Sequence, residues 1–190
     1  MSEELYTPPS FVKKFDFRGV YGKDITESHA YYLGHALSQI LPLKKVLIGW
    51  DTRASSFSLA NHFMRALHES EIELFYLPKC PIDYVTAGAY TGEYDLSVMF
   101  TGSHNPWDWT GLLMHLHKGE SVQGELVQKI IHTYYEVLRE EFSEEPFNLT
   151  HATDVTEDTE RLYAEKISSL LPLQEIKSLA VLVDLGDGSG

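Results

Sequence analysis

The most informative segment of this 190-residue chain is the hexapeptide Thr101-Gly102-Ser103-His104-Asn105-Pro106, around which the rest is organised. It follows the apolar run of residues 96–100, which predicts a buried strand, and it precedes a second short apolar run. Gly102 can adopt backbone angles that other residues avoid, and Pro106 stiffens the far side of the turn. The pattern therefore predicts that Ser103 presents its hydroxyl on a tight, exposed turn where a strand leaves the core.

Several functions are open to such a serine. A serine in a turn rich in Gly, Asn and Pro is often turn chemistry alone. A hydrolase nucleophile elbow, G-x-S-x-G, does not fit, because it requires glycine where Thr101 and Asn105 stand. A hydroxyl that is exposed and backed by a rigid sheet does suit a group that must carry phosphate.

Three segments together resemble one enzyme family. The hexapeptide resembles the phosphoserine loop of the α-D-phosphohexomutases (phosphomannomutase and phosphoglucomutase), where T-A-S-H-N-P is usual and Gly102 here replaces the alanine. Residues 15–19, F-D-F-R-G, resemble the family's Y-D-I-R-G-like motif, and residues 49–56, G-W-D-T-R-A-S-S, resemble its G-R-D-T-R-x-S-S motif. The resemblance covers residues 11–140 well and residues 155–190 loosely.

The resemblance implies an intramolecular phosphotransferase of the isomerase class, which moves phosphate between C1 and C6 of a hexose through a bisphosphate. It implies that Ser103 carries the phosphate and, once phosphorylated, gives one oxygen to Mg²⁺, whose other ligands lie in a second domain. His104 would flank the phosphate, and Asn105 would shape the turn beside it. Arg18 and Arg53 would neutralise the phosphate from the floor of an electropositive hollow. The alternative for Arg53 is that it only pairs with Asp51 and caps its own loop.

Two positions depart from the family pattern. Leu113 stands where the family's P-x-x-Y-N-G-I-K motif has a lysine thought to help deprotonate the attacking hydroxyl, and a leucine cannot transfer a proton. Trp50 removes one arginine of the usual set. We hypothesise that His115, or else Lys118, replaces the missing base; the alternative is a surface histidine. An H-x-H pair formed with residue 117 lacks a visible third ligand for zinc.

Alternating strand and helix patterns predict an α/β fold. The expected form is a three-layer α/β/α domain around a mixed, mostly parallel sheet with one antiparallel strand. Strands are predicted at residues 15–19, 46–49, 72–77, 96–100 and 112–117, and helices at residues 26–41, 55–67, 121–140 and 159–171. Residues 81–90 are predicted to form a loop that enters a short helix. The Ser103 loop and the loop of Asp51 and Arg53 both follow the carboxyl ends of strands, where open α/β sheets form ligand crevices.

Residues 1–145 are expected to form the phosphoserine domain, residues 146–158 an acidic linker, and residues 159–190 the start of a second domain with a strand at 179–185. We therefore expect the chain to be part of a protein more than twice this length. The resemblance implies that the family's metal-binding loop, its sugar-recognition loop and its C-terminal phosphate-binding segment lie in domains II–IV. We therefore expect that this chain alone does not turn over a substrate.

Composition narrows the class of partner. The net charge of −13, without a Lys/Arg cluster, argues against nucleic acid and anionic membrane surfaces and leaves a hexose phosphate as the expected partner. The single cysteine, Cys80, allows no intrachain disulfide and fits a cytoplasmic location. The competing function is a catalytically degenerate protein of the same fold that binds a phosphosugar or another partner, which Leu113 and Trp50 favour.

Overall fold

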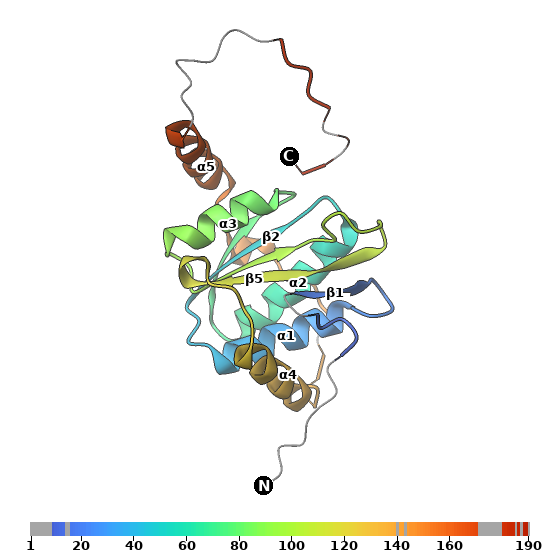
Figure 1. Cartoon of the computed structure of the whole chain (residues 1–190). Helices are drawn as coiled ribbons and strands as arrows, with labels where there is room; N and C mark the ends of the chain where they lie inside the picture. Colours follow the sequence, from blue (N-terminus) through green and yellow to red (C-terminus); the bar gives the residue numbers. More distant parts are fainter. Residues whose placement is uncertain are drawn as a thin grey trace.

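A six-stranded sheet forms the centre of the computed structural model, which describes residues 9–13, 16–139, 141–142, 144–170, 180–184, 186 and 188–189. The strand order is β1-β5-β4-β2-β3-β6 (Figure 1). In chain order the strands are β1 (Phe17–Val20), β2 (Lys45–Trp50), β3 (Glu73–Leu77), β4 (Leu96–Phe100), β5 (Trp109–Leu116) and β6 (Thr153–Asp154).

One strand runs against all the others. β5 is antiparallel to both of its neighbours, β4 and β1, whereas β4, β2, β3 and β6 pair in parallel. The short loop from β4 to β5 is the cause, because neighbouring strands joined by so few residues can only run antiparallel. The prediction of a mostly parallel sheet with one antiparallel strand is confirmed.

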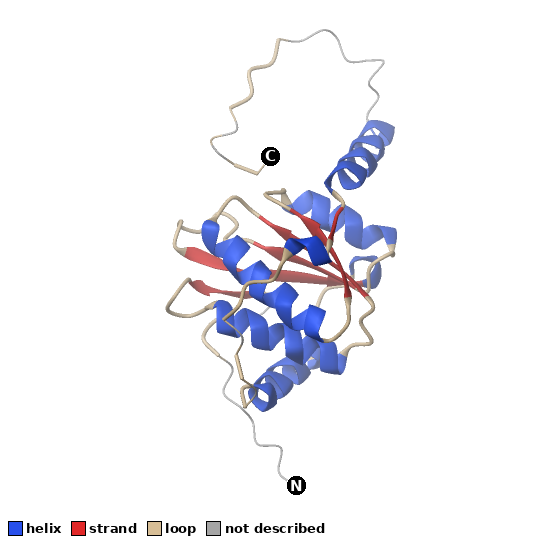
Figure 2. Cartoon of the chain, turned by 180° about the vertical axis from the view of Figure 1, so that it is seen from behind, coloured by secondary structure: helices blue, strands red, loops and turns tan. Residues whose placement is uncertain are grey.

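Helices cover both faces of the sheet, as a three-layer domain requires. The helices are α1 (Glu27–Ile40), α2 (Ala54–Glu69), α3 (Ile82–Thr91), α4 (Glu125–Val137) and α5 (Thr156–Leu170). α1, α2 and α4 lie on one face and α3 lies on the other (Figures 1 and 2). α5 contacts α3, with the rings of Tyr84 and Tyr163 centred 5.4 Å apart. None of the described helices is long and apolar enough to cross a membrane.

The central strands are buried on both sides, which is why their sequences are apolar throughout rather than alternating. Along β4, Val98 and Phe100 join the larger core beneath α1, α2 and α4, and Met99 joins the smaller core beneath α3. All five residues of β4 are buried. This strand is therefore a rigid support for the loop that leaves its carboxyl end.

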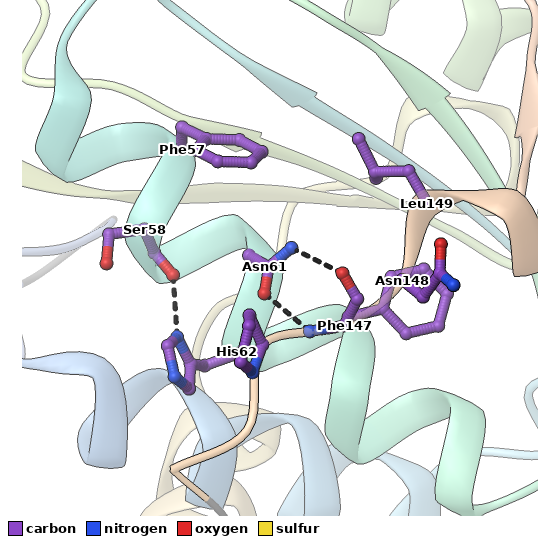
Figure 3. Close-up of a pocket in the computed structure, with 8 residues that line it drawn as sticks. Phe57, Ser58, Asn61, His62, Phe147, Asn148 and Leu149 are labelled. Atoms are coloured by element: carbon purple, nitrogen blue, oxygen red, sulfur yellow. Dashed lines mark hydrogen bonds between the residues drawn. The ribbon is translucent and has the colours of Figure 1, made fainter.

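Residues 147–154, inside the predicted linker, pack on the sheet domain. Phe147 is buried, and the Asn61 side chain on α2 bonds both of its backbone groups: Nδ2 donates to the carbonyl at 2.9 Å, and Oδ1 accepts from the amide at 2.6 Å (Figure 3). A pocket of about 370 Å³ lies between this segment and α2. β6 then adds the last strand beside β3.

The strand predicted at residues 179–185 is not observed. Residues 180–184 have no strand structure, and Val181, Leu182 and Val183 are exposed. The physical reason is that an apolar run forms a strand only beside a partner, and no described strand pairs with it. Positions 15, 140, 171, 179 and 185 of the predicted elements lie outside the described residues.

Replacing Asn61 with alanine should release the segment around Phe147. The change leaves a buried backbone amide and carbonyl without partners, which costs about 1–3 kcal/mol of unfolding free energy. Denaturant unfolding measures the loss, and amide hydrogen exchange at Phe147 and β6 should rise with it. The matched control is Asn148→Ala, which removes an exposed amide whose hydrogen bonds among the described residues go to Thr150. Equal stability of the two variants would contradict this role of Asn61.

Candidate active site

The predicted serine lies on an exposed turn at the sheet edge. Thr101 extends the β4–β5 pairing by one bond, from its amide to the Gly111 carbonyl at 3.0 Å, and the chain then leaves the sheet. Ser103 is exposed and has a φ of 54°, in the left-handed region that favours glycine. Its Oγ lies 3.3 Å from Nδ1 of the exposed His104. A non-glycine residue keeps such a conformation only when its surroundings enforce it.

Asp51, just after β2, organises the start of the turn. Its Oδ2 accepts from the Thr101 hydroxyl at 2.8 Å and from the Gly102 amide at 3.2 Å, and its Oδ1 accepts from the Arg53 amide at 3.0 Å. The Thr101 hydroxyl in turn accepts from the Ser103 amide at 2.8 Å. One carboxylate therefore fixes the backbone on both sides of Gly102.

Arg53 fills the inside of the turn. Its Nη1 donates to the carbonyls of Pro106 and Trp109, and its Nη2 donates to those of Ser103 and Asn105. Its Nε lies 3.5 Å from Oδ2 of Asp51. The alternative in which Arg53 pairs with Asp51 and caps the loop thus describes this geometry better than a guanidinium facing a phosphate.

Arg18 does not join Arg53. It extends from β1, which β5 separates from β4, and its Nη2 pairs with Oδ2 of Asp16 at 2.9 Å. In the part of the chain that the structure describes, no hydrogen bond or ion pair links Arg18 to the Ser103 loop. Among the described residues, therefore, Arg53 is bound to carbonyl oxygens and Arg18 is paired with Asp16, and the shared floor of two guanidinium groups stays a prediction.

A cavity of about 370 Å³ opens beside Ser103, and its lining is not strongly cationic. Among the described residues its ionisable members are Asp51, Asp83 and Arg53, and Gly188 and Ser189 also line it. The lining also includes Thr52, Pro81 and Ile82, at the N-termini of α2 and α3. Helix N-termini carry a positive partial charge and bind anions. The two helix N-termini are therefore the candidate source of attraction for a phosphate at this edge.

The site offers few ligands for a metal ion. No group of three or more His, Cys, Asp or Glu residues that could hold a metal occurs among the residues described. Ser103 Oγ is exposed and could act as one ligand, although it contacts His104 Nδ1, whereas Asp51 already accepts three hydrogen bonds. Ser103 can therefore contribute to a metal site but cannot complete one with these neighbours.

The two predicted replacements for the missing base lie at the wrong end of the sheet. His115 pairs in register with Ser97, three residues before the end of β4, or roughly 10 Å from the edge that carries Ser103. Lys118 lies still farther along, in the 3₁₀ turn His117–Gly119. This register is inconsistent with either residue acting as a base at Ser103. His104, Asn105 and Arg53 are the predicted residues that lie together with Ser103.

His115 is half-buried rather than a free surface histidine. Both ring nitrogens are buried without a hydrogen-bond partner among the described residues. Burial lowers its pKa, and the backbone of Gly119 opposes that shift only in part.

Lowering the pH should therefore reduce the free energy of unfolding more in the wild-type chain than in a His115→Gln variant. Because the native pKa lies below the unfolded value of about 6.5, the unfolded chain takes up the proton first, and stability falls as the pH drops through that value. The limit for one proton is about 1.4 kcal/mol per pH unit. Denaturant unfolding from pH 8 to pH 5 measures the difference, and parallel curves for the two proteins would contradict it.

Comparison with known proteins places this geometry among sugar-phosphate mutases. Residues 10–142 match the model of the phosphoglucomutase/phosphomannomutase α/β/α domain I. A phosphomannomutase of Methanocaldococcus jannaschii is 37% identical over 102 residues, which are 54% of this chain and 22% of that protein. A phosphoglucomutase of Neisseria gonorrhoeae is 34% identical over 124 residues, 63% of this chain and 26% of that protein.

Longer matches reach further along the chain. A phosphoglucosamine mutase of Prochlorococcus marinus is 25% identical over 175 residues, 90% of this chain and 38% of that protein. A phosphoglucomutase/phosphomannomutase family protein of Burkholderia thailandensis superposes with a TM-score of 0.66 at 24% identity, covering 85% of this chain and 36% of that one. A structure from Thermus thermophilus gives a TM-score of 0.71 at 20% identity, covering 88% of this chain and 37% of that one. The chain thus spans less than two fifths of the length of these proteins.

Proposed function

This chain belongs to the phosphoglucomutase/phosphomannomutase family, and on that basis we propose that it is the phosphoserine-bearing domain of a phosphohexomutase. The observation that carries the proposal is the Ser103 hydroxyl, exposed on a left-handed turn whose backbone is held from inside by Arg53 and Asp51. Phosphoryl transfer depends chiefly on positioning, which a rigid turn supplies.

The step assigned to this domain is transfer between a hexose bisphosphate and Ser103. The bond from phosphorus to Ser103 Oγ forms while the bond to the sugar oxygen breaks. The serine proton leaves through His104 Nδ1, 3.3 Å from Oγ, and the departing sugar oxygen takes up one proton. The N-termini of α2 and α3 offset the charge of the phosphoryl oxygens. Asn105 keeps the turn closed, because its backbone N–H donates a hydrogen bond to the Gly102 carbonyl.

A magnesium ion would neutralise the phosphoryl group when bound. Ser103 fits as one of its ligands, and we place the remaining ligands in a further domain, because the described residues do not complete a site. Residues 1–145 would form the phosphoserine domain together with residues 147–154, which were expected in the 146–158 linker but pack on the sheet, and residues 159–190 would start the next domain. The names of the relatives refer to different hexose phosphates, although all of them match this domain. We therefore assign the selection of the sugar substrate to the further domains.

A second candidate follows from one substitution. Leu113 faces Met99 across the β4–β5 pair, where it offers no group that could accept a proton. A domain that binds a phosphosugar without turning it over would tolerate this leucine. Labelling of Ser103 separates the two functions, because only a phosphate carrier forms the covalent serine ester.

Incubation with glucose 1,6-bisphosphate should add one phosphoryl group to the chain, detected by intact mass. The Ser103→Ala variant should gain none, because it lacks the accepting oxygen. The matched control is Ser169→Ala, on the exposed part of α5, which should label like the wild type. Labelling should be measured with the 190-residue chain and with any longer product of the same gene. Absence of labelling, or label that survives Ser103→Ala, would contradict the phosphoserine role.

A further inference from the structure

We propose that Arg53 is a positioning residue that aims the backbone N–H of His104 at the phosphate carried by Ser103, and that it makes no contact with that phosphate itself. The inference rests on the proposed function, because it concerns how the phosphorylated serine is stabilised. It assigns to a peptide group the role that the sequence pattern suggested for an arginine side chain.

The donors of Arg53 are already occupied. A guanidinium has five N–H groups in a fixed plane. The Nη1 and Nη2 groups meet the carbonyls of Trp109, Ser103 and Asn105 at 2.9, 3.1 and 2.8 Å, together with that of Pro106, and Nε faces Asp51. No donor remains for a phosphate on the outer side of the turn, so a direct contact would require breaking this set.

The orientation of His104 N–H follows from the geometry of the peptide bond. In a trans peptide the C=O and the N–H that follows it point in opposite directions. The Ser103 carbonyl points inward to Nη2, so the N–H of His104 points away from the guanidinium. The amides of Gly102, Ser103 and Asn105 are bonded within the loop network. The His104 amide, beside the serine hydroxyl, has no acceptor among the described residues.

The arrangement separates charge across the turn. The carbonyl oxygens of four peptide groups face the half-buried guanidinium, and in the Ser103–His104 peptide the N–H is turned away from it. A fixed N–H group of this kind stabilises an anion without reorganisation, as at helix N-termini and oxyanion holes. A lysine could not replace Arg53 here, because an ammonium presents three donors at one point instead of a planar fork.

Gly102 provides a second way to disturb the same contact. A Cβ at this position would lie 2.4 Å from Cζ of Arg53 and 2.5 Å from the Trp109 carbonyl oxygen. The guanidinium occupies the space that an alanine side chain needs. Gly102→Ala should therefore displace Arg53 while leaving its charge in the protein.

The test uses the 190-residue chain with phosphoserine installed at position 103 during synthesis, so it does not depend on enzymatic labelling. We expect the His104 amide proton to move downfield in ¹H–¹⁵N spectra as the phosphate ionises between pH 5 and pH 8, with a phosphate pKa below the ordinary value of about 6 in ³¹P spectra. Arg53→Lys and Gly102→Ala should each lose at least half of the amide shift and raise the phosphate pKa toward about 6.

Arg65→Lys is the matched control, because Arg65 pairs with Glu69 near the other end of α2 and should change neither signal. Denaturant unfolding of each variant separates a local change from loss of the fold. If Arg53→Lys does not fold, Gly102→Ala provides the same test of the Arg53 contacts. The proposal would be overturned if the His104 amide proton of the wild type did not shift as the phosphate ionises. It would also be overturned if the Arg53→Lys variant kept the full shift. Failure of bisphosphate labelling alongside a normal His104 response would count against the proposed function only.

Discussion

The contact between the Arg53 guanidinium and the carbonyl oxygens of the Ser103 loop is the constraint on which the rest of the site depends. It closes the turn from inside, and Asp51 closes it from the strand side. A left-handed serine is costly in a free chain, so its conformation must be enforced by such contacts. Gly102 completes the set by leaving room for the guanidinium where any side chain would collide with it.

The sheet explains why this turn lies where it does. β4 is buried on both faces, and β5 returns beside it, so the connecting loop must rise from the carboxyl edge of a fixed support. The same edge receives the N-termini of α2 and α3, whose dipoles favour anions. Under the proposed function, these backbone groups would supply much of the positive charge that the family pattern assigns to arginine side chains. The net charge of −13 would not prevent such local binding of an anion.

Much of this could be predicted from the sequence, and the failures have physical causes. Periodicity located the main helices and strands, because buried strands and amphipathic helices leave different patterns. β6 was not predicted, because its two polar residues show no strand pattern. The segment that carries it is held to α2 by Asn61 and Phe147, which lie 86 residues apart in the sequence. The alternation of side chains along β5 predicted that His115 and Leu113 share one face of the sheet. It did not give the pairing of His115 with Ser97, which places His115 away from the edge that carries Ser103. Where the guanidinium of Arg53 points depends on carbonyls more than fifty residues away, which no local motif encodes.

The state of that guanidinium can be observed directly. The ¹H–¹⁵N spectrum of the arginine side chains, recorded on the unmodified chain, reports whether each Nη group is fixed or rotating. We predict separate, slowly exchanging Nη signals for Arg53, with hydrogen-bond couplings to the carbonyl carbons of Ser103 and Asn105, and averaged signals for the exposed Arg161. Averaged Arg53 signals without those couplings would contradict the account, because the turn would then lack the group said to hold it.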